Sequence, residues 1–164
     1  MTREGDGQRH TRLNRPAPAF VGRQYAAMAT MPLLQTYIVE DSPVILENLV
    51  ATLEELAEVH VIGSAADEQS AVKWLTQARE PCDLMIIDVF LKGGSGLGVL
   101  RAATQLQRPI RRVVLTNYAT PDMREKCREL GADRVFDKSN ELEDLITYCC
   151  RLANGDSTAP GVFR

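Results

Sequence analysis

From Leu33 onward, the chain alternates between short apolar runs and longer stretches in which apolar residues recur every three or four positions. Short apolar runs are typical of buried strands, and the three- to four-residue spacing is typical of amphipathic helices. The runs predict strands at residues 33–39, 58–65, 83–88, 111–116 and 133–137. The stretches between and after them predict helices at residues 43–57, 67–79, 96–106, 120–130 and 141–151.

Residues at the helix boundaries agree with this division. Ser42 can cap the first helix, and Pro43 takes the first helical position, which proline favours. Asp67 can cap the second helix, whose inward stripe includes Trp74 as an expected core residue. Gly131 follows the fourth helix at the position where glycine commonly ends a helix.

Five strands that alternate with five helices predict an α/β fold, with a five-stranded parallel sheet and helices on both faces. Right-handed crossovers make such a sheet doubly wound, and we expect the flavodoxin-like strand order 2-1-3-4-5. Alternation along the second strand predicts Val59, Val61 and Gly63 on the same face. This domain is expected to span residues 33–152, between a disordered N-terminal extension at 1–32 and a flexible tail at 153–164.

The first 30 residues are rich in arginine, glycine, proline and alanine and show no sustained period, which predicts disorder. Five arginines against Glu4 and Asp6 give this segment a charge of +3, so the total of −3 leaves −6 for the remainder. A nucleic-acid-binding arm, a targeting peptide and a flexible extension are the alternatives. Dispersed arginines make no compact patch, which favours an extension created by an early start codon, with Met28 and Met31 as alternative starts.

The composition excludes several classes of protein. A net charge of −3 does not suggest a nucleic-acid or membrane-surface binder. Cys82, Cys127, Cys149 and Cys150 have no CxxC spacing, which favours small buried residues in a reducing compartment over a metal site. Two histidines are too few for a zinc site or a histidine-dependent triad to be expected. No apolar run approaches the roughly 20 residues of a membrane span, and the N-terminus lacks the apolar core of a secretory signal, so we expect a cytoplasmic protein.

Chemically informative residues follow the predicted strand ends. Glu40 and Asp41 follow the first strand and Lys138 follows the fifth, while Asp88 ends the third and Thr116 ends the fourth. In the order 2-1-3-4-5 the first and third strands are neighbours, so their three carboxylates should converge and require a cation. An all-oxygen ligand set suits Mg²⁺, and the lysine and threonine can hold phosphoryl oxygens. Asp88 is then a plausible nucleophile toward phosphorus, which would give an acyl phosphate.

Each of these residues has an ordinary structural role as its alternative, because acids before a helix mostly cap it and favour its dipole. The glycine-rich stretch GGSG at residues 93–96 lacks the GxxxxGK[ST] pattern, so a flexible turn is expected there rather than a phosphate cradle. The joint occurrence of these residues in order at successive strand ends favours the chemical interpretation.

Four motifs carry a resemblance to a known family: VEDSP (39–43), LMIIDVFLKGGSG (84–96), VVLTNYA (113–119) and VFDKS (135–139). With them, residues 33–152 resemble the receiver domain of two-component response regulators. The resemblance implies an acidic pair for Mg²⁺ at Glu40 and Asp41, with Asp41 the direct ligand, a phosphoacceptor at Asp88, a further metal ligand in the backbone carbonyl of Phe90, a switch hydroxyl at Thr116 and a phosphate-binding lysine at Lys138.

The chain departs from the pattern of this family at four positions. Lys92 and Ser139 stand where the family often has proline, and Asn117 stands where alanine or glycine is usual. Val135 stands where the family has the aromatic residue that couples to the threonine. Gly96 falls where a family glycine is expected.

The resemblance implies a stand-alone receiver that takes a phosphoryl group from a sensor histidine kinase or a histidine phosphotransfer protein. It would catalyse only its own phosphorylation and dephosphorylation. Because the 13 residues after Arg151 are too few for a DNA-binding module, we expect no direct contact with nucleic acid and a downstream protein partner instead. A dimer through the face formed by residues 120–151 is a further expectation. The alternatives are a Mg²⁺-dependent aspartate-nucleophile phosphohydrolase and a non-phosphorylated interaction module of the same fold.

Overall fold

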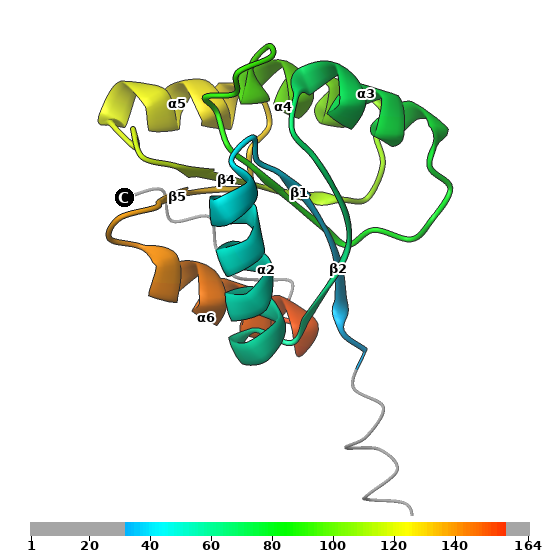
Figure 1. The fold of residues 1–164 in the computed structure, drawn as a ribbon, viewed down its shortest axis with the longest axis vertical. Coiled ribbons are helices and arrows are strands. Elements are labelled where there is room, and N and C mark those ends of the chain that lie inside the picture. The colour runs from blue at the N-terminus through cyan, green and yellow to red at the C-terminus, as the bar shows by residue number, and fades with distance from the viewer. Residues whose placement is uncertain (1–31, 157–164) are drawn as a thin grey trace, which may run out of the picture. The chain divides into compact units, whose positions relative to one another are not determined.

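The computed structural model describes residues 32–156, in which five strands alternate with five helices (Figure 1). The elements are β1 (Leu34–Val39), α2 (Pro43–Leu56), β2 (Val59–Ala65), α3 (Glu68–Gln77), β3 (Leu84–Ile87), α4 (Gly96–Gln105), β4 (Arg111–Thr116), α5 (Pro121–Glu129), β5 (Arg134–Asp137) and α6 (Leu142–Ala153). All ten predicted elements are therefore present. Residues 1–31, which hold nearly all of the predicted extension, and residues 157–164 of the predicted tail lie outside the described residues.

The five strands form one parallel sheet in the order β2-β1-β3-β4-β5. Helices α3, α4 and α5 cover one face, and α2 and α6 cover the other (Figure 1). The predicted doubly wound fold and its strand order are confirmed. Because all strands run in the same direction, their carboxyl ends lie at one edge of the sheet, where ligands bind in folds of this kind.

The central strand β3 contributes to both hydrophobic cores. Met85 and Ile87 pack under α3, α4 and α5, whereas Leu84 and Ile86 pack under α2 and α6. All four side chains are at most 1% exposed, which explains why this strand is a continuous apolar run rather than an alternating one. The residue that follows, Asp88, is thus the first polar group beyond a fully buried strand.

Side-chain caps mark where α2 and α3 begin. The Ile45 amide donates to the Ser42 hydroxyl at 3.4 Å, and the Ser70 amide donates to the Asp67 carboxylate at 2.8 Å. Both predicted caps are therefore confirmed. Gly131, just past the end of α5, has a φ of +100°, a left-handed conformation that favours glycine.

Strand β2 departs from strict alternation. Its register against β1 shifts between Thr36 and Tyr37, because Ile62 is an extra residue on the β2 side. After this bulge the chain reverses its facing: a Cβ at Gly63 would contact the Tyr37 ring at 3.0 Å, in the core under α3, whereas Val61 packs on the opposite face. The prediction that Val61 and Gly63 share a face is wrong for this reason.

The Tyr37 ring also fixes the position of the single tryptophan. Trp74 stacks on it with ring centroids 3.8 Å apart, half-buried against the core. Trp74 therefore packs against the core, as predicted, but its side chain is only partly buried.

Three of the four cysteines are buried, and all four are free thiols. Burial raises the pKa of Cys149 to about 12, which keeps this thiol protonated and unreactive. The prediction of small buried residues is confirmed for Cys82, Cys127 and Cys149, while Cys150 is half-buried.

Helix α2 buries Leu49 and Leu53 but leaves other apolar residues in solvent. Val44 is 68% exposed, Ile45 40% and Leu56 55%. Two of these, Val44 and Ile45, lie in the first turn, beside the carboxyl edge of the sheet. None of the helices within residues 32–156 has the length and apolar character needed to cross a membrane.

Candidate functional site

Backbone hydrogen bonds extend the sheet by one residue past three strand ends. The Glu40 amide donates to the carbonyl of the last residue of β2, at 3.0 Å. The Asp88 amide donates to that of β1, at 3.0 Å, and the Lys138 amide donates to that of β4, at 2.9 Å. These bonds hold the backbone of all three residues, so their side chains leave the edge of the sheet from fixed neighbouring positions.

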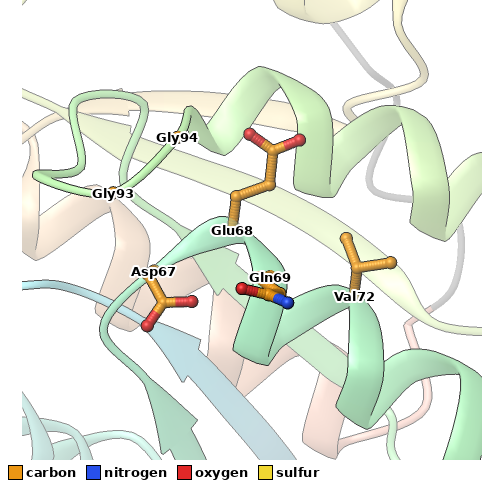
Figure 2. A pocket seen from close by; sticks show the side chains of 6 residues that line it. All are labelled: Asp67, Glu68, Gln69, Val72, Gly93 and Gly94. Atoms are coloured by element: carbon orange, nitrogen blue, oxygen red, sulfur yellow. The ribbon is translucent and has the colours of Figure 1, made fainter.

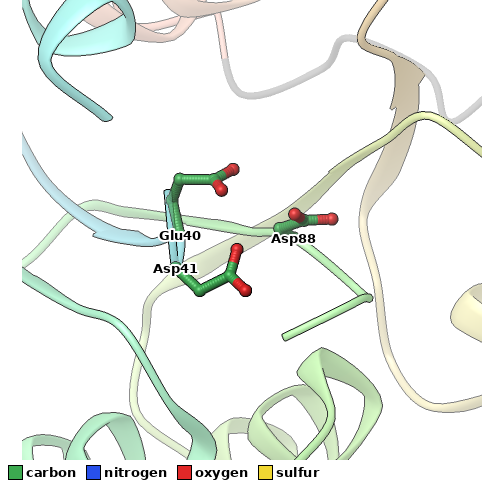
Figure 3. A group of neighbouring side chains, drawn as sticks. All are labelled: Glu40, Asp41 and Asp88. Atoms are coloured by element: carbon green, nitrogen blue, oxygen red, sulfur yellow. The ribbon is translucent and has the colours of Figure 1, made fainter. Parts of the chain in front are cut away.

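Three carboxylates converge at this edge (Figure 3). One oxygen atom from each of Glu40, Asp41 and Asp88 lies within 4.8 Å of the other two. Glu40 and Asp88 are buried and Asp41 is half-buried. The predicted convergence is therefore confirmed, and this set of hard oxygen donors could hold a metal ion of the Mg²⁺ type.

Lys138 lies between two of these acids. Its Nζ donates to Glu40 Oε2 at 2.6 Å and to Asp88 Oδ2 at 2.9 Å. Burial alone would lower the pKa of Lys138, but the hydrogen bonds to Glu40 and Asp88 and their negative charges outweigh burial and raise it. Lys138 therefore contacts Glu40 as well as Asp88, and its charge offsets those of both buried carboxylates.

The two acids that follow β1 differ in their surroundings. Glu40 uses both oxygens within the protein, since Oε1 accepts from the Ser42 amide at 3.0 Å and Oε2 accepts from Lys138. Asp41 Oδ2 accepts from the Lys92 amide at 2.9 Å, and this carboxylate is more exposed. Asp41 is therefore the more accessible of the pair to a ligand that arrives from solvent.

The loop that follows Asp88 is closely packed against the strand it leaves. The Gly96 amide donates to the Val89 carbonyl at 2.9 Å, and Phe90 and Ser95 form an antiparallel bridge. A Cβ at Gly96 would lie 1.9 Å from the Asp88 carbonyl oxygen, which leaves room for glycine alone. The loop therefore returns to the end of β3 at Gly96.

Lys92 holds this loop through a group that proline lacks. Its backbone amide donates to Asp41, a bond that proline at this position could not make. At this position, where proline was the expected residue, a hydrogen bond to one of the three clustered acids holds the loop instead. The sequence contains no signal for this bond, because every residue other than proline has an amide.

Thr116 lies fully buried at the end of β4. Its hydroxyl accepts a hydrogen bond from the Tyr118 amide at 3.2 Å. The Tyr118 ring packs edge-to-face on Phe90 with centroids 4.8 Å apart, although the two residues are 60% and 52% exposed. The loops after β3 and β4 therefore touch through two exposed aromatic rings, a contact that sequence analysis missed.

A groove of about 280 Å³ opens next to Lys138, between α2 and the start of α6. Its lining consists of Ile45, Asn48, Leu49, Thr52, Leu115, Asn117, Lys138 and Leu142. Because Lys138 belongs both to this groove and to the acidic cluster, the groove connects the cluster with the exposed apolar turn of α2.

Comparison with known proteins agrees with this geometry. The family model for the response regulator receiver domain matches residues 36–149. The chain belongs to this family. Receiver domains are the phosphoacceptor signalling domains of two-component systems, and they act in signalling rather than in metabolism. The Lys138–Ser139 peptide bond of this receiver domain is trans, like the other peptide bonds of residues 32–156.

Two curated relatives are transcriptional regulatory proteins. PdtaR of Mycobacterium tuberculosis is 34% identical over 110 residues, which cover 66% of this chain and 51% of that protein. YvfU of Bacillus subtilis is 27% identical over 123 residues, which cover 75% of this chain and 60% of that protein. The chain thus spans between about half and three fifths of the length of these relatives.

Solved structures of response regulators share the fold. One is a two-component response regulator of the LuxR family from an Aurantimonas species, with a TM-score of 0.67, 22% identity, and coverage of 75% of this chain and 86% of that one. Another is a response regulator from Burkholderia pseudomallei with a phosphorylated aspartic acid, a calcium ion and citrate. Its TM-score is 0.61, with 22% identity, and the match covers 76% of this chain and 73% of that one.

Proposed function

We propose that this receiver domain accepts a phosphoryl group from a phosphohistidine onto Asp88, with Mg²⁺ as cofactor. The observation that carries the proposal is the position of Asp88, whose carboxylate lies beside two further acids and within 2.9 Å of the Lys138 ammonium. Such a carboxylate has a site for a cation on one side and a fixed positive charge on the other. The phosphorylated aspartic acid and calcium ion in the Burkholderia protein of the same fold support the assignment.

The transfer needs little chemistry beyond placement. A carboxylate oxygen of Asp88 attacks the phosphorus atom while the bond from phosphorus to the histidine nitrogen breaks. The electron pair of that bond stays on the ring nitrogen, which takes up a proton, and an acyl phosphate forms on Asp88. Lys138 is placed to hold one phosphoryl oxygen, and the Thr116 hydroxyl can turn from the Tyr118 amide to donate to another.

The three acids are proposed to have different roles in metal binding. Asp41, Asp88 and the Phe90 backbone carbonyl are the proposed ligands, while Glu40 orients Lys138 and contributes charge. This division follows from the bonds of Glu40, whose two oxygens are both engaged with protein donors, whereas Asp41 is more exposed. When bound, Mg²⁺ supplies positive charge that offsets the phosphoryl oxygens.

The proposed donor is a sensor histidine kinase or a histidine phosphotransfer protein that presents its histidine from a helix. Val44 and Ile45 form an exposed apolar turn beside the acidic cluster, and the groove next to them leads to Lys138. An amphipathic helix packed on this turn would bring a side chain to Asp88 along that groove. The phosphorylated form is proposed to signal to a protein partner through the face formed by α5, β5 and α6, which is also the proposed dimer face.

Treatment with acetyl phosphate, with and without Mg²⁺, tests the proposal. We expect a mass gain of one phosphate that requires Mg²⁺, disappears in Asp88→Asn and persists in Asp83→Asn. Asp83 is the matched control, since it precedes β3 at the opposite edge of the sheet, where its carboxylate accepts from the Gln35 amide at 2.8 Å.

Two other outcomes would each replace the proposal with an alternative. If no phosphodonor gives a mass gain on the wild-type protein, the chain is an interaction module of the same fold. Steady release of free phosphate from a small organic phosphate would identify an aspartate-nucleophile phosphohydrolase instead.

A further inference from the structure

Glu68, the first residue of α3, makes two hydrogen bonds to the loop that follows Asp88, one as acceptor and one as donor. The Ser95 amide donates to Glu68 Oε2 at 2.7 Å, and the Glu68 amide donates to the Gly93 carbonyl at 2.9 Å. Figure 2 shows the Glu68 side chain extending from the start of α3 toward the loop that carries Gly93 and Gly94, beside the pocket that these residues line. Glu68 thus joins two segments that are more than 20 residues apart in the chain.

Two glycines leave the space that this carboxylate occupies. A Cβ at Gly94, where φ is +80°, would lie 2.5 Å from the Cβ of Glu68. A Cβ at Gly98 would lie 2.0 Å from Glu68 Oε1. Side chains at either position would displace Glu68, so the glycines and the glutamate fit one another as a set.

The charge of Glu68 suits its position at the start of α4. Ser95 is the N-cap of this helix, and its hydroxyl accepts from the Leu97 amide at 3.1 Å. The Ser95 amide itself is satisfied by the Glu68 carboxylate. A carboxylate at a helix N-terminus is favoured by the helix dipole, and a charged acceptor strengthens the hydrogen bond. Glu68 therefore acts as a second cap of α4, supplied from α3.

The loop after Asp88 has two other bonds to carboxylates, one from the Phe90 amide to Asp88 Oδ1 at 3.4 Å and one from the Lys92 amide to Asp41. Under the proposed function Asp41 is a metal ligand, and an Asp41 carboxylate that turns toward a cation weakens its bond to Lys92. Glu68 lies on the other side of the loop and keeps its two bonds. Because Ser95 forms an antiparallel bridge with Phe90, Glu68 helps to fix where Phe90 presents its carbonyl.

We propose that Glu68 is a positioning residue of the phosphoacceptor site, which holds the loop between Asp88 and Ser95 in the conformation that binds Mg²⁺. This inference rests on the proposed function, because it assigns Glu68 a role in metal binding at Asp88. It also explains how a loop with lysine in place of the family's common proline keeps a defined conformation.

The first test compares Glu68→Gln and Glu68→Ala with the matched control Glu54→Gln. Glu54 makes the same kind of bond, since its Oε1 accepts from the Val61 amide at 3.0 Å, but it lies in the last turn of α2, away from the carboxyl edge. Two readouts are measured on each protein. Amide hydrogen exchange of Ser95 in the metal-free protein reports on the tether, and a Mg²⁺ titration followed by amide chemical shifts reports the metal affinity.

For both Glu68 variants we expect faster exchange at Ser95 and an affinity for Mg²⁺ reduced about tenfold, the lower end of the range for residues that support a metal ligand. Glu54→Gln should leave both quantities unchanged, even if its melting temperature falls as far as that of the Glu68 variants. If Glu68→Ala accelerates exchange at Ser95 but binds Mg²⁺ as tightly as the wild type, the contact is structural only and the proposal is wrong.

Gly98→Ala is the second variant, and it separates positioning from stability. The added methyl group would take the place of Glu68 Oε1, while alanine is a better helix former than glycine. We expect an unchanged or higher melting temperature together with the weaker Mg²⁺ binding of Glu68→Gln, and no further loss in the double variant. A Gly98→Ala protein with wild-type affinity for Mg²⁺ would also overturn the proposal.

The two readouts distinguish failure of this inference from failure of the proposed function. If the wild-type protein binds no Mg²⁺ and takes no phosphoryl group from acetyl phosphate, the proposed function fails and the positioning role fails with it. Exchange at Ser95 would in that case still show whether Glu68 holds the loop. Wild-type Mg²⁺ binding that the Glu68 variants retain overturns the positioning role alone.

Discussion

The loops after β3 and β4 lie at the carboxyl edge of the sheet, and they are held in different ways. The loop after β3 runs from Asp88 to Ser95, and carboxylates fix it on both sides, with Asp41 bonded to Lys92 and Glu68 bonded to Ser95. These two tethers come from the end of β1 and from a separate helix, and the Phe90 amide also donates to Asp88 at the start of the loop. This loop has few ways to move unless one of these carboxylates moves first.

The loop after β4 is held by the groups at its own ends. Its Tyr118 amide donates to the Thr116 hydroxyl at 3.2 Å, and its Ala119 carbonyl accepts from Arg124 Nε at 3.0 Å. Arg124 also donates to the Val135 carbonyl at 2.9 Å and to the Glu141 carboxylate. One arginine thus joins this loop to β5 and to the start of α6.

The difference assigns separate roles to the two loops. Under the proposed function, Thr116 turns its hydroxyl toward the phosphoryl group, so the first tether of the β4 loop is the one that phosphorylation breaks. The β3 loop has no tether to this hydroxyl and remains in place. The conformational change is then expected to pass from Thr116 through Ala119 to Arg124. This route would replace the aromatic coupling residue of the family, which is Val135 in this chain.

The largest effect is expected at Lys138, whose ammonium group pairs with the buried carboxylates of Glu40 and Asp88. In Lys138→Met, Glu40 and Asp88 keep their burial but lose their shared cation, so the free energy of unfolding should fall by about 3 kcal/mol without Mg²⁺. Saturating Mg²⁺ should restore part of the loss, because it binds the folded state. Chemical denaturation with and without Mg²⁺ measures both quantities.

The pH of that measurement follows from the pKa of Lys138. This pKa is raised in the folded state above its ordinary value of 10.5, so the stabilisation is complete below pH 10.5 and is lost only as the pH rises through the higher folded value. Denaturation at neutral pH therefore records the whole contribution. The control is Lys73→Met on the exposed side of α3, and equal losses in the two variants would contradict the electrostatic role of Lys138.

A smaller effect is expected at Arg124, where the comparison between the loops is tested directly. Lysine cannot reach three acceptors as the guanidinium does, so Arg124→Lys should cost about 1 kcal/mol in the free energy of unfolding. A β4 loop released from this tether should also rearrange more easily. Phosphorylation by acetyl phosphate should then become about fivefold faster, the lower end of typical coupling between sites.

Arg128→Lys is the control for this prediction, since the Arg128 guanidinium pairs with Glu125 on the same helix. Its phosphorylation rate should match that of the wild type. An unchanged rate in Arg124→Lys, together with unchanged amide exchange at residues 117–119, would mean that the β4 loop is as firmly fixed as the β3 loop.

The fold was predictable from the sequence because burial in a parallel sheet leaves a clear pattern. The four apolar residues before Asp88 and the capping side chains of Ser42 and Asp67 set the elements, and the common strand direction brings Glu40 and Lys138 to one edge. These features depend on hydrophobicity and on local hydrogen bonding, which single residues report.

The tethers of the two loops were not predictable in the same way. Glu68 resembles any acid in the first turn of a helix, and Arg124 resembles any basic residue on an exposed helix, until the fold supplies their distant acceptors. The bulge at Ile62 likewise depends on a tertiary contact, the place that the Tyr37 ring takes above Gly63. Long-range polar pairs and register shifts leave no periodic signal along the chain.

The smallest expected effect is the contact between the two loops themselves. The rings of Phe90 and Tyr118 meet at 4.8 Å and an interplanar angle of 64°, so a double-mutant cycle to alanine should give a coupling energy of about 0.5 kcal/mol, the lower limit for aromatic pairs. A parallel cycle between Phe90 and Leu56, at the far end of α2, should give none, because distant sites are additive.

Repeating the Phe90–Tyr118 cycle with Mg²⁺ and beryllofluoride, a phosphoryl analogue, shows which loop moves. The Tyr118 amide is expected to lose Thr116 as its acceptor, so the Tyr118 ring should leave Phe90 and the coupling energy should fall to zero. Coupling that survives in the beryllofluoride form would require that both loops move together or that neither moves. The Glu68 and Asp41 tethers act on the β3 loop. If both loops move, or if neither does, the distinction between a fixed β3 loop and a moving β4 loop is lost.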